Sequence, residues 1–220
     1  MRNSSTIHRR AGTAAIVLLL LAATGGCHSA LATIAYLVKG TNIDAEYTGL
    51  KQKKVAVVCR PLVALQYRDT HAAKDVAAQV AALIRQNVPK VQVIDAQKVN
   101  EWTDENMWDE FAEVGKALGA DVVVGIDLQS FSLYQGQTLY QGKADAQVTV
   151  IDCKDGDKVV FEKVLPQLIY PPNAAIPTSE RPEREFRREF VAVLADQIAR
   201  HFYAHDAYAD YAQDAQALMK

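Results

Sequence analysis

The chain has 220 residues, of which 50% are hydrophobic and 23% are charged, and its formal net charge is −2. This length suits one globular domain with tails. Proteins that bind nucleic acid usually carry a large basic surface, so a mildly acidic composition leads us to expect no nucleic-acid partner.

A basic and apolar segment opens the chain. Arg2, Arg9 and Arg10 precede an apolar run over residues 11–23, and Thr24-Gly25-Gly26-Cys27 follows it. The run has about 13 residues, whereas a helix that spans a bilayer needs roughly 17–25. A positive end, a short apolar core and small residues before a cysteine predict a signal peptide over residues 1–26. Its removal takes away three arginines and no acid, which changes the net charge from −2 to −5.

This segment resembles the lipoprotein signals of bacterial envelope proteins. Their signal peptidase cuts before the cysteine, the sulfur carries a diacylglyceryl group, and the new amino group is often acylated with a chain such as palmitate. The resemblance implies lipidation of Cys27 and a membrane partner through that lipid, on the periplasmic side of the outer membrane. Thr24 departs from the leucine preferred there. Two alternatives stay open: a transmembrane anchor over residues 11–38, and ordinary cleavage that leaves no lipid.

The rest of the chain divides into three parts. Residues 27–53 are expected to form the anchor and a tether, since they pass from apolar to polar around a turn at residues 39–42. Residues 54–205 are expected to form one α/β domain, and residues 206–220 a helical or frayed tail.

The domain opens with a predicted strand and helix. Residues 55–59 are uninterrupted and Val-rich, which is typical of a strand buried on both faces. Asp69 or Thr70 can cap the helix that follows, and its apolar residues recur every three or four positions. Pro89 disfavours a helical conformation at Val88, so the helix should end at Asn87.

A short strand over residues 91–94 comes next, and Asp95 is suited to cap a short helix over residues 97–102. A second helical stripe runs from Met107 to Leu118 and should end at Gly119, because glycine adopts the left-handed conformation at low cost. Residues 122–126 then form another predicted buried strand.

The pattern changes to an antiparallel meander beyond residue 126. The third strand continues to about residue 134, and a turn at residues 135–137 reverses it. Residues 144–150 alternate apolar and polar, as in a strand with one wet face. Asp155-Gly156 is a strong hairpin signal before a last strand over residues 159–165. A proline-rich loop over residues 170–182 leads to the longest helix.

That helix is predicted over residues 183–205, with Phe186, Phe190, Leu194, Ile198 and Phe202 on one face. The expected order is strand–helix–strand–helix–strand–strand–strand–helix. The fold class is therefore α/β (mixed α+β), with a central mixed sheet of about five strands and helices packed on it.

Four stretches of this pattern resemble the α/β module shared by the amino-terminal domain of TolB, the curli-secretion lipoprotein CsgG and the penicillin-binding-protein activator LpoB. They are residues 55–58, 93–100, 116–125 and 148–160. The resemblance implies an envelope protein that binds other proteins, with no shared catalytic position.

Several polar residues are candidates for sites of chemistry. His201 and His205 lie four apart beside Asp206, a spacing that would suit a metal on a helix face. No third ligand can be named, and a solvated helix end is the favoured explanation. Asp145, Asp152, Asp155 and Asp157 do not match a calcium loop, and turn formation explains the last three. Ser130 and Ser132 lie on a strand and not on a nucleophile elbow. Arg60-Pro61-Leu62 follows the first strand in place of a glycine-rich phosphate loop.

Two cysteines and one hairpin complete the candidates. Cys59 and Cys153 fall in predicted strands and are expected to be small buried residues, although export would permit a bridge between them. The hairpin carries Leu133, Tyr134, Leu139 and Tyr140, which either form an exposed docking surface or cover the sheet.

The sequence therefore predicts a membrane-anchored envelope lipoprotein that acts as a non-catalytic protein-binding or accessory module, without a cofactor or a metal. One alternative is a subunit of an oligomeric secretion or transport assembly, and another is a metal-binding or enzymatic periplasmic protein.

Overall fold

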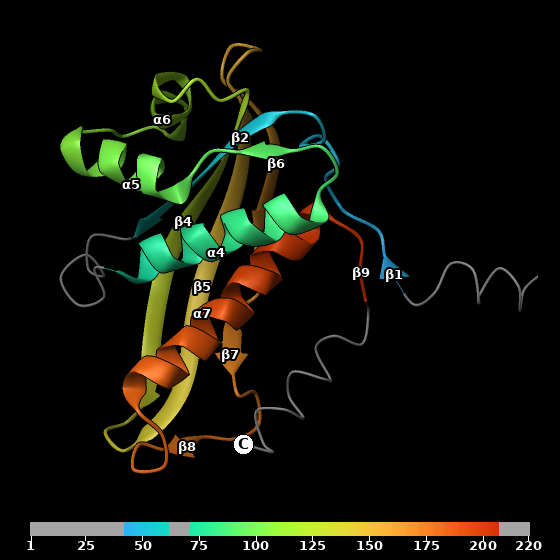
Figure 1. The fold of residues 1–220 in the computed structure, drawn as a ribbon. Helices are drawn as coiled ribbons and strands as arrows, with labels where there is room; N and C mark the ends of the chain where they lie inside the picture. Colours follow the sequence, from blue (N-terminus) through green and yellow to red (C-terminus); the bar gives the residue numbers. More distant parts are fainter. Residues whose placement is uncertain (1–41, 62–70, 207–220) are drawn as a thin grey trace, which may run out of the picture. The chain divides into compact units, whose positions relative to one another are not determined.

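A mixed sheet forms the centre of the fold, as the sequence predicts (Figure 1). The computed structural model describes residues 42–61 and 71–206, so the signal segment, Cys27, Asp69, Thr70 and the tail beyond residue 206 lie outside the described residues. The chain divides into residues 1–42 and a compact unit that begins at Ile43.

The sheet has the strand order β3-β2-β4-β5-β6, with β2 parallel to both of its neighbours and the later pairs antiparallel. Two further strands, β7 and β8, pair with β5. The bounds are β2 (Lys54–Pro61), β3 (Gln92–Val93), β4 (Val122–Gln135), β5 (Leu139–Asp152), β6 (Lys158–Val164), β7 (Leu168–Tyr170) and β8 (Ile176–Pro177). The short strands β1 (Asn42–Ile43) and β9 (His205–Asp206) form a separate two-stranded sheet.

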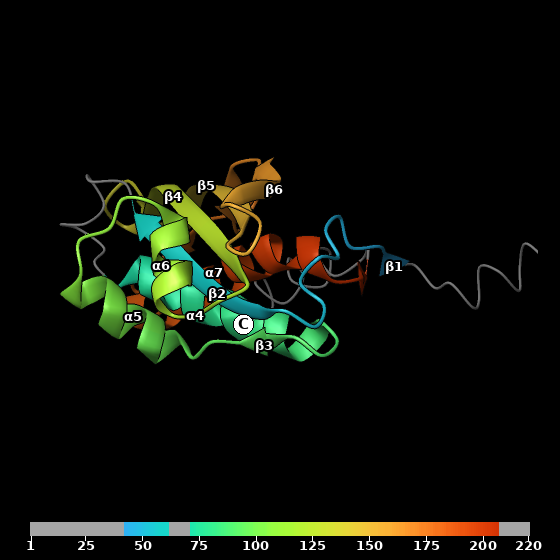
Figure 2. The same ribbon diagram turned by 90° about the horizontal axis from the view of Figure 1, so that it is seen from above.

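Helices cover both faces of the sheet (Figures 1 and 2). On one face lie α4 (Ala72–Asn87) and α7 (Glu183–Ala199), which is followed by the 3-10 turn η1 (Arg200–Phe202). On the other face lie α5 (Ala96–Glu105) and α6 (Phe111–Ala117). Alternate residues of β2 divide between the two cores: Val55 and Val57 face α4 and α7, whereas Ala56 and Val58 face α5 and α6.

Local signals set several element ends where they were predicted. The Asp95 carboxylate accepts a hydrogen bond of 2.8 Å from the Gln97 N–H at the start of α5, and α4 ends at Asn87. Gly119 has a φ of +64° after α6. The N-cap of α4, in contrast, is His71, whose side chain makes no capping hydrogen bond.

The structure differs from the predicted elements in several places. Met107 is fully exposed and lies before α6, because Glu110 and Glu113 form a capping box that starts the helix at Phe111. The proline-rich segment contains β8, which was predicted as loop. The last helix ends at Ala199 and not near residue 205.

Part of the segment predicted as a tether packs on the domain. Leu50 is fully buried in the core. The Tyr47 ring lies 5.5 Å from the Phe161 ring and 6.4 Å from the Phe202 ring. The Tyr47 N–H also donates a 3.0 Å hydrogen bond to the His201 carbonyl, which fastens this segment to the end of the last helix.

Cys59 and Cys153 are free thiols. Cys59 lies in β2 opposite Ile126, whereas Cys153 lies in the turn after β5 and its N–H donates a hydrogen bond to the Asp121 carbonyl. The prediction that Cys153 lies in a strand is therefore wrong. Five residues, about 16 Å of extended chain, separate Ile126 from Asp121, whereas a disulfide needs Cα atoms within about 7 Å. Among the described residues, no helix combines the length and apolar character needed to cross a bilayer.

Candidate functional site

A cavity of about 510 Å³ lies between α7 and the strands beside it, and we call it the α7–β7 groove. Its lining is mainly apolar, with a few polar side chains. The lining residues are Ala144, Ala146, Lys163, Leu165, Pro166, Gln167, Leu168, Ile169, Pro172, Leu194, Gln197 and His201. Its size and composition match those of ligand-binding sites, which are typically concave, mostly apolar and about 300–1,000 Å³ in volume.

Small side chains on β5 create the hollow. Ala144 and Ala146 face α7, whereas the same face of β5 carries the larger Val148 and Val150 further along the strand. The smaller residues leave space beneath α7, and Leu194 bounds it from the helix side. Opposite α7, the Leu165 N–H donates a 3.0 Å hydrogen bond to the Ala146 carbonyl, which holds the segment between β6 and β7 beside the groove.

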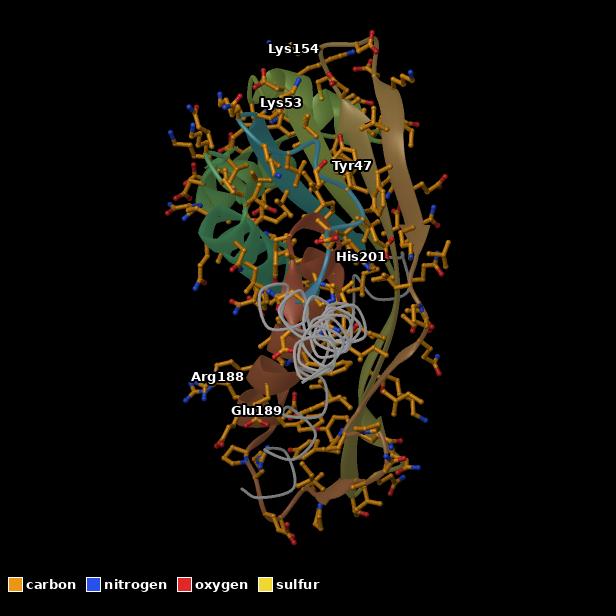
Figure 3. The ribbon with its side chains drawn as sticks, turned by 90° about the vertical axis from the view of Figure 1, so that its right-hand side faces the viewer. Tyr47, Lys53, Lys154, Arg188, Glu189 and His201 are labelled. Atoms are coloured by element: carbon orange, nitrogen blue, oxygen red, sulfur yellow. The ribbon has the colours of Figure 1, made fainter. Side chains whose placement is uncertain are left out.

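Three polar side chains meet at one end of the groove. The Lys163 ammonium lies 2.8 Å from Glu46 Oε2 and 3.0 Å from Glu46 Oε1. The Nδ1 atom of His201 lies 3.1 Å from the same Oε1 atom. Tyr47 and His201 lie together where the N-terminal segment meets the end of α7 (Figure 3). Glu46 thus links this segment to both sides of the groove.

These contacts shift two ionisation equilibria. The hydrogen bond from Lys163 is the largest cause that lowers the pKa of Glu46, and His201 adds to the effect. Burial lowers the pKa of His201, although the Glu46 carboxylate opposes that shift. A neutral imidazole that donates to a carboxylate fits both directions, so the cluster of Lys163, Glu46 and His201 has little net charge near neutral pH.

The cluster predicts a pH dependence of stability. The ordinary pKa of histidine is 6.5, and the pKa of His201 is lower than this in the folded protein. Just below pH 6.5 the unfolded chain therefore binds more protons than the folded protein. The free energy of unfolding should therefore fall on acidification from about pH 7.5 to 5.5. His201→Gln, which does not titrate, should show a shallower decline in thermal unfolding. An equal decline in both proteins would contradict this role of His201.

The two histidines considered as metal ligands do not share a helix face. His201 lies in η1, beyond the end of α7, and His205 lies in β9. The prediction that both histidines lie on one helix is therefore wrong, because α7 ends at Ala199. Across residues 42–61 and 71–206, no group of three or more His, Cys, Asp or Glu side chains is placed to hold a metal ion.

The candidate carboxylates are held by turns and strand neighbours. The Asp152 side chain accepts hydrogen bonds from the backbone N–H groups of Lys154 and Asp155, as in a hairpin turn. Asp157 pairs with Lys116. On the sheet, Asp145 accepts from the Ser130 hydroxyl and from Gln167. The Ser132 hydroxyl contacts only the backbone of Tyr134 among the hydrogen bonds found in the described residues.

The hairpin between β4 and β5 mainly covers the sheet. Leu133 and Tyr140 are buried, and the Tyr140 ring stacks 4.9 Å from Phe186. Leu139 is half-buried, and Tyr134, the most exposed of the four residues, donates a 2.5 Å hydrogen bond to Glu183. This bond raises the pKa of Tyr134 and lowers that of Glu183. The packing supports the covering interpretation over an apolar docking surface.

Comparisons with known proteins assign no family. No protein-family model and no curated protein sequence matches the chain. Among solved structures, lipoprotein GNA1162 from Neisseria meningitidis is 15% identical, over 66% of this chain and 97% of that chain, with a TM-score of 0.41. The PelC dodecamer from Paraburkholderia phytofirmans is 12% identical, over 71% of this chain and 94% of that chain, with a TM-score of 0.40.

A minor lipoprotein from Acinetobacter baumannii is 16% identical, over 68% of this chain and 91% of that chain, with a TM-score of 0.30. The solved structures similar to this chain thus include bacterial lipoproteins. The resemblance to the module of TolB, CsgG and LpoB stays a prediction, because these low similarities show no specific family.

Proposed function

We propose that this protein is an envelope lipoprotein, anchored through Cys27 at the periplasmic face of the outer membrane, that acts without catalysis by binding another envelope protein. The α7–β7 groove is the proposed contact surface. The anchor is supported by the signal-like segment before Cys27. The binding role is supported chiefly by one observation, a cavity of about 510 Å³ with an apolar lining and a polar end.

The groove suits an apolar side chain that carries or neighbours a polar group. Leu165, Leu168 and Leu194 provide apolar contacts, and burying one large aliphatic or aromatic side chain contributes about 1.5–3 kcal/mol. Gln197 and Lys163 can then fix its orientation, because polar groups at the edge of an apolar pocket confer specificity more than affinity. The tethered domain would act by holding such a partner near the membrane.

Photocrosslinking in cells tests this proposal. We expect a photoreactive phenylalanine analogue at Gln197, which lines the groove, to give a discrete crosslinked product that mass spectrometry can identify. The same analogue at Glu101, exposed on α5 on the opposite face of the sheet, should not give that product.

Two adjacent substitutions provide a matched control. Leu165→Asp places a charge in the groove and should remove the Gln197 product. Val164→Asp, at a position 66% exposed and outside the groove lining, should leave it unchanged. A product that is equally strong from Glu101, or that persists in Leu165→Asp, would show that the groove is not the contact surface.

A further inference from the structure

A second groove runs between α4 and α7, and we call it the arginine groove. It has a volume of about 430 Å³ and is lined by Asp75, Ala78, Gln79, Arg184, Arg187, Arg188, Val191 and Ala192. Ala78, Val191 and Ala192 supply its apolar lining. None of its residues lines the α7–β7 groove.

The arginine groove is locally positive in an acidic chain. Three guanidinium groups and one carboxylate line it, whereas the whole chain has a net charge of −2. Arg187 is engaged, since its Nη2 atom lies 3.4 Å from Glu183 Oε1 and its guanidinium lies 6.0 Å from the centre of the Phe131 ring.

Arg184 and Arg188 differ from Arg187. Both are exposed, and neither forms an ion pair with the residues that the structure describes. Arg188 extends outward from α7 (Figure 3). Like charges four residues apart on a helix destabilise it slightly, so the pair of Arg184 and Arg188 does not stabilise α7. The two guanidinium groups are available to bind carboxylates in a fork-like geometry.

The shape of the arginine groove favours a peptide segment over a flat membrane surface as its ligand. The small and apolar side chains lie in a recess that a bilayer surface does not enter. The large apolar side chains that are exposed in the described residues, at positions 43, 107, 134, 159 and 164, do not line the groove and provide no membrane anchor beside it.

The spacing of the charges also fits a peptide. Four residues of helix place Arg184 and Arg188 about 6 Å apart along the axis. Alternate residues of an extended chain are about 6.6 Å apart, so acidic side chains at alternate positions could meet both arginines.

From these observations we infer that the arginine groove binds an extended acidic segment of a protein partner, with carboxylates on Arg184 and Arg188 and small side chains over Ala78 and Ala192. This inference rests on the proposed protein-binding function and adds the charge of the partner and a second contact surface.

Fluorescence anisotropy tests the inference on the full-length protein in neutral detergent at low salt. The probe is a short labelled peptide of alternating glutamate and alanine, with a glutamine–alanine peptide as the neutral comparison. We expect the acidic peptide to bind and the neutral peptide not to bind. The double variant Arg184→Gln/Arg188→Gln should weaken binding about tenfold, through the loss of two exposed guanidinium–carboxylate contacts.

The control is the double variant Arg85→Gln/Lys98→Gln, which removes the same charge from exposed positions outside the arginine groove and should change binding less than twofold. Equal weakening in both doubles would show non-specific attraction and overturn the inference. No binding of the acidic peptide would also overturn it, as would loss of phosphatidylglycerol-vesicle binding in the groove double with peptide binding unchanged. The crosslink from Gln197 tests the α7–β7 groove in a separate experiment. Failure of the peptide experiment would therefore overturn the arginine groove alone and would leave the proposed function untouched.

Discussion

Replacing Phe190 with alanine is expected to lower the free energy of unfolding by about 3–5 kcal/mol. The Phe190 side chain is fully buried between α7 and the sheet. Its ring centre lies 5.2 Å from that of Phe131 and 6.5 Å from that of Phe186. Gly142 lies directly beneath, since a Cβ atom built there would be 2.5 Å from Phe190 Cδ2. The absence of a side chain at Gly142 thus makes room for the Phe190 ring. Removal of the ring leaves a cavity that the neighbouring side chains fill only in part.

Chemical denaturation measures this loss, which is a large share of the 5–15 kcal/mol typical of a domain. Val164→Ala is the control, because its side chain is 66% exposed, and it should change the free energy by less than about 0.5 kcal/mol. A loss below about 1 kcal/mol in Phe190→Ala would mean that the ring does not pack between Gly142 and Phe131 as described.

The strands of the fold follow from local patterns. The uninterrupted apolar runs of β2 and β4 are buried on both faces, and the alternation along residues 144–150 of β5 places the even-numbered ones in the core. Such periods depend on neighbours in sequence, so the sequence alone suffices to predict them. The cap at Asp95 and the stop at Gly119 are equally local.

Other features depend on contacts between distant residues. Leu50 and Tyr47 lie in a mostly polar segment, yet Leu50 is buried in the core and the Tyr47 ring packs against Phe161 and Phe202. Met107 fits the apolar stripe of the next helix, yet the cap at Glu110 leaves it outside that helix. A helical period alone does not show where a capping residue will override it.

The α7–β7 groove illustrates the same limit. Ala144 and Ala146 match the expected alternation, but the sequence does not show what volume α7 leaves above them. Glu46 meets Lys163 and His201 across more than a hundred residues of chain, so no local spacing indicates that cluster. The alignment of the α7 arginines with Ala78 of α4 is also a non-local feature, so the sequence does not indicate the arginine groove.

Cys27→Ser is expected to have the largest effect on the location of the protein. A triacylated cysteine carries more than one chain, each buried methylene contributes roughly 0.8 kcal/mol, and stable anchoring needs at least two signals. Loss of the lipid should therefore release the protein from the membrane fraction. Globomycin, which inhibits the lipoprotein signal peptidase, should cause a larger precursor of the unsubstituted protein to accumulate.

Metabolic labelling with radioactive palmitate tests the lipid anchor most directly. The unsubstituted protein and Cys59→Ser, which changes a half-buried thiol within the domain, should both be labelled, and Cys27→Ser should carry no label. Membrane association that persists without label in Cys27→Ser would indicate a transmembrane anchor instead. Label in Cys27→Ser equal to that of the unsubstituted protein would contradict the proposed lipid anchor at Cys27.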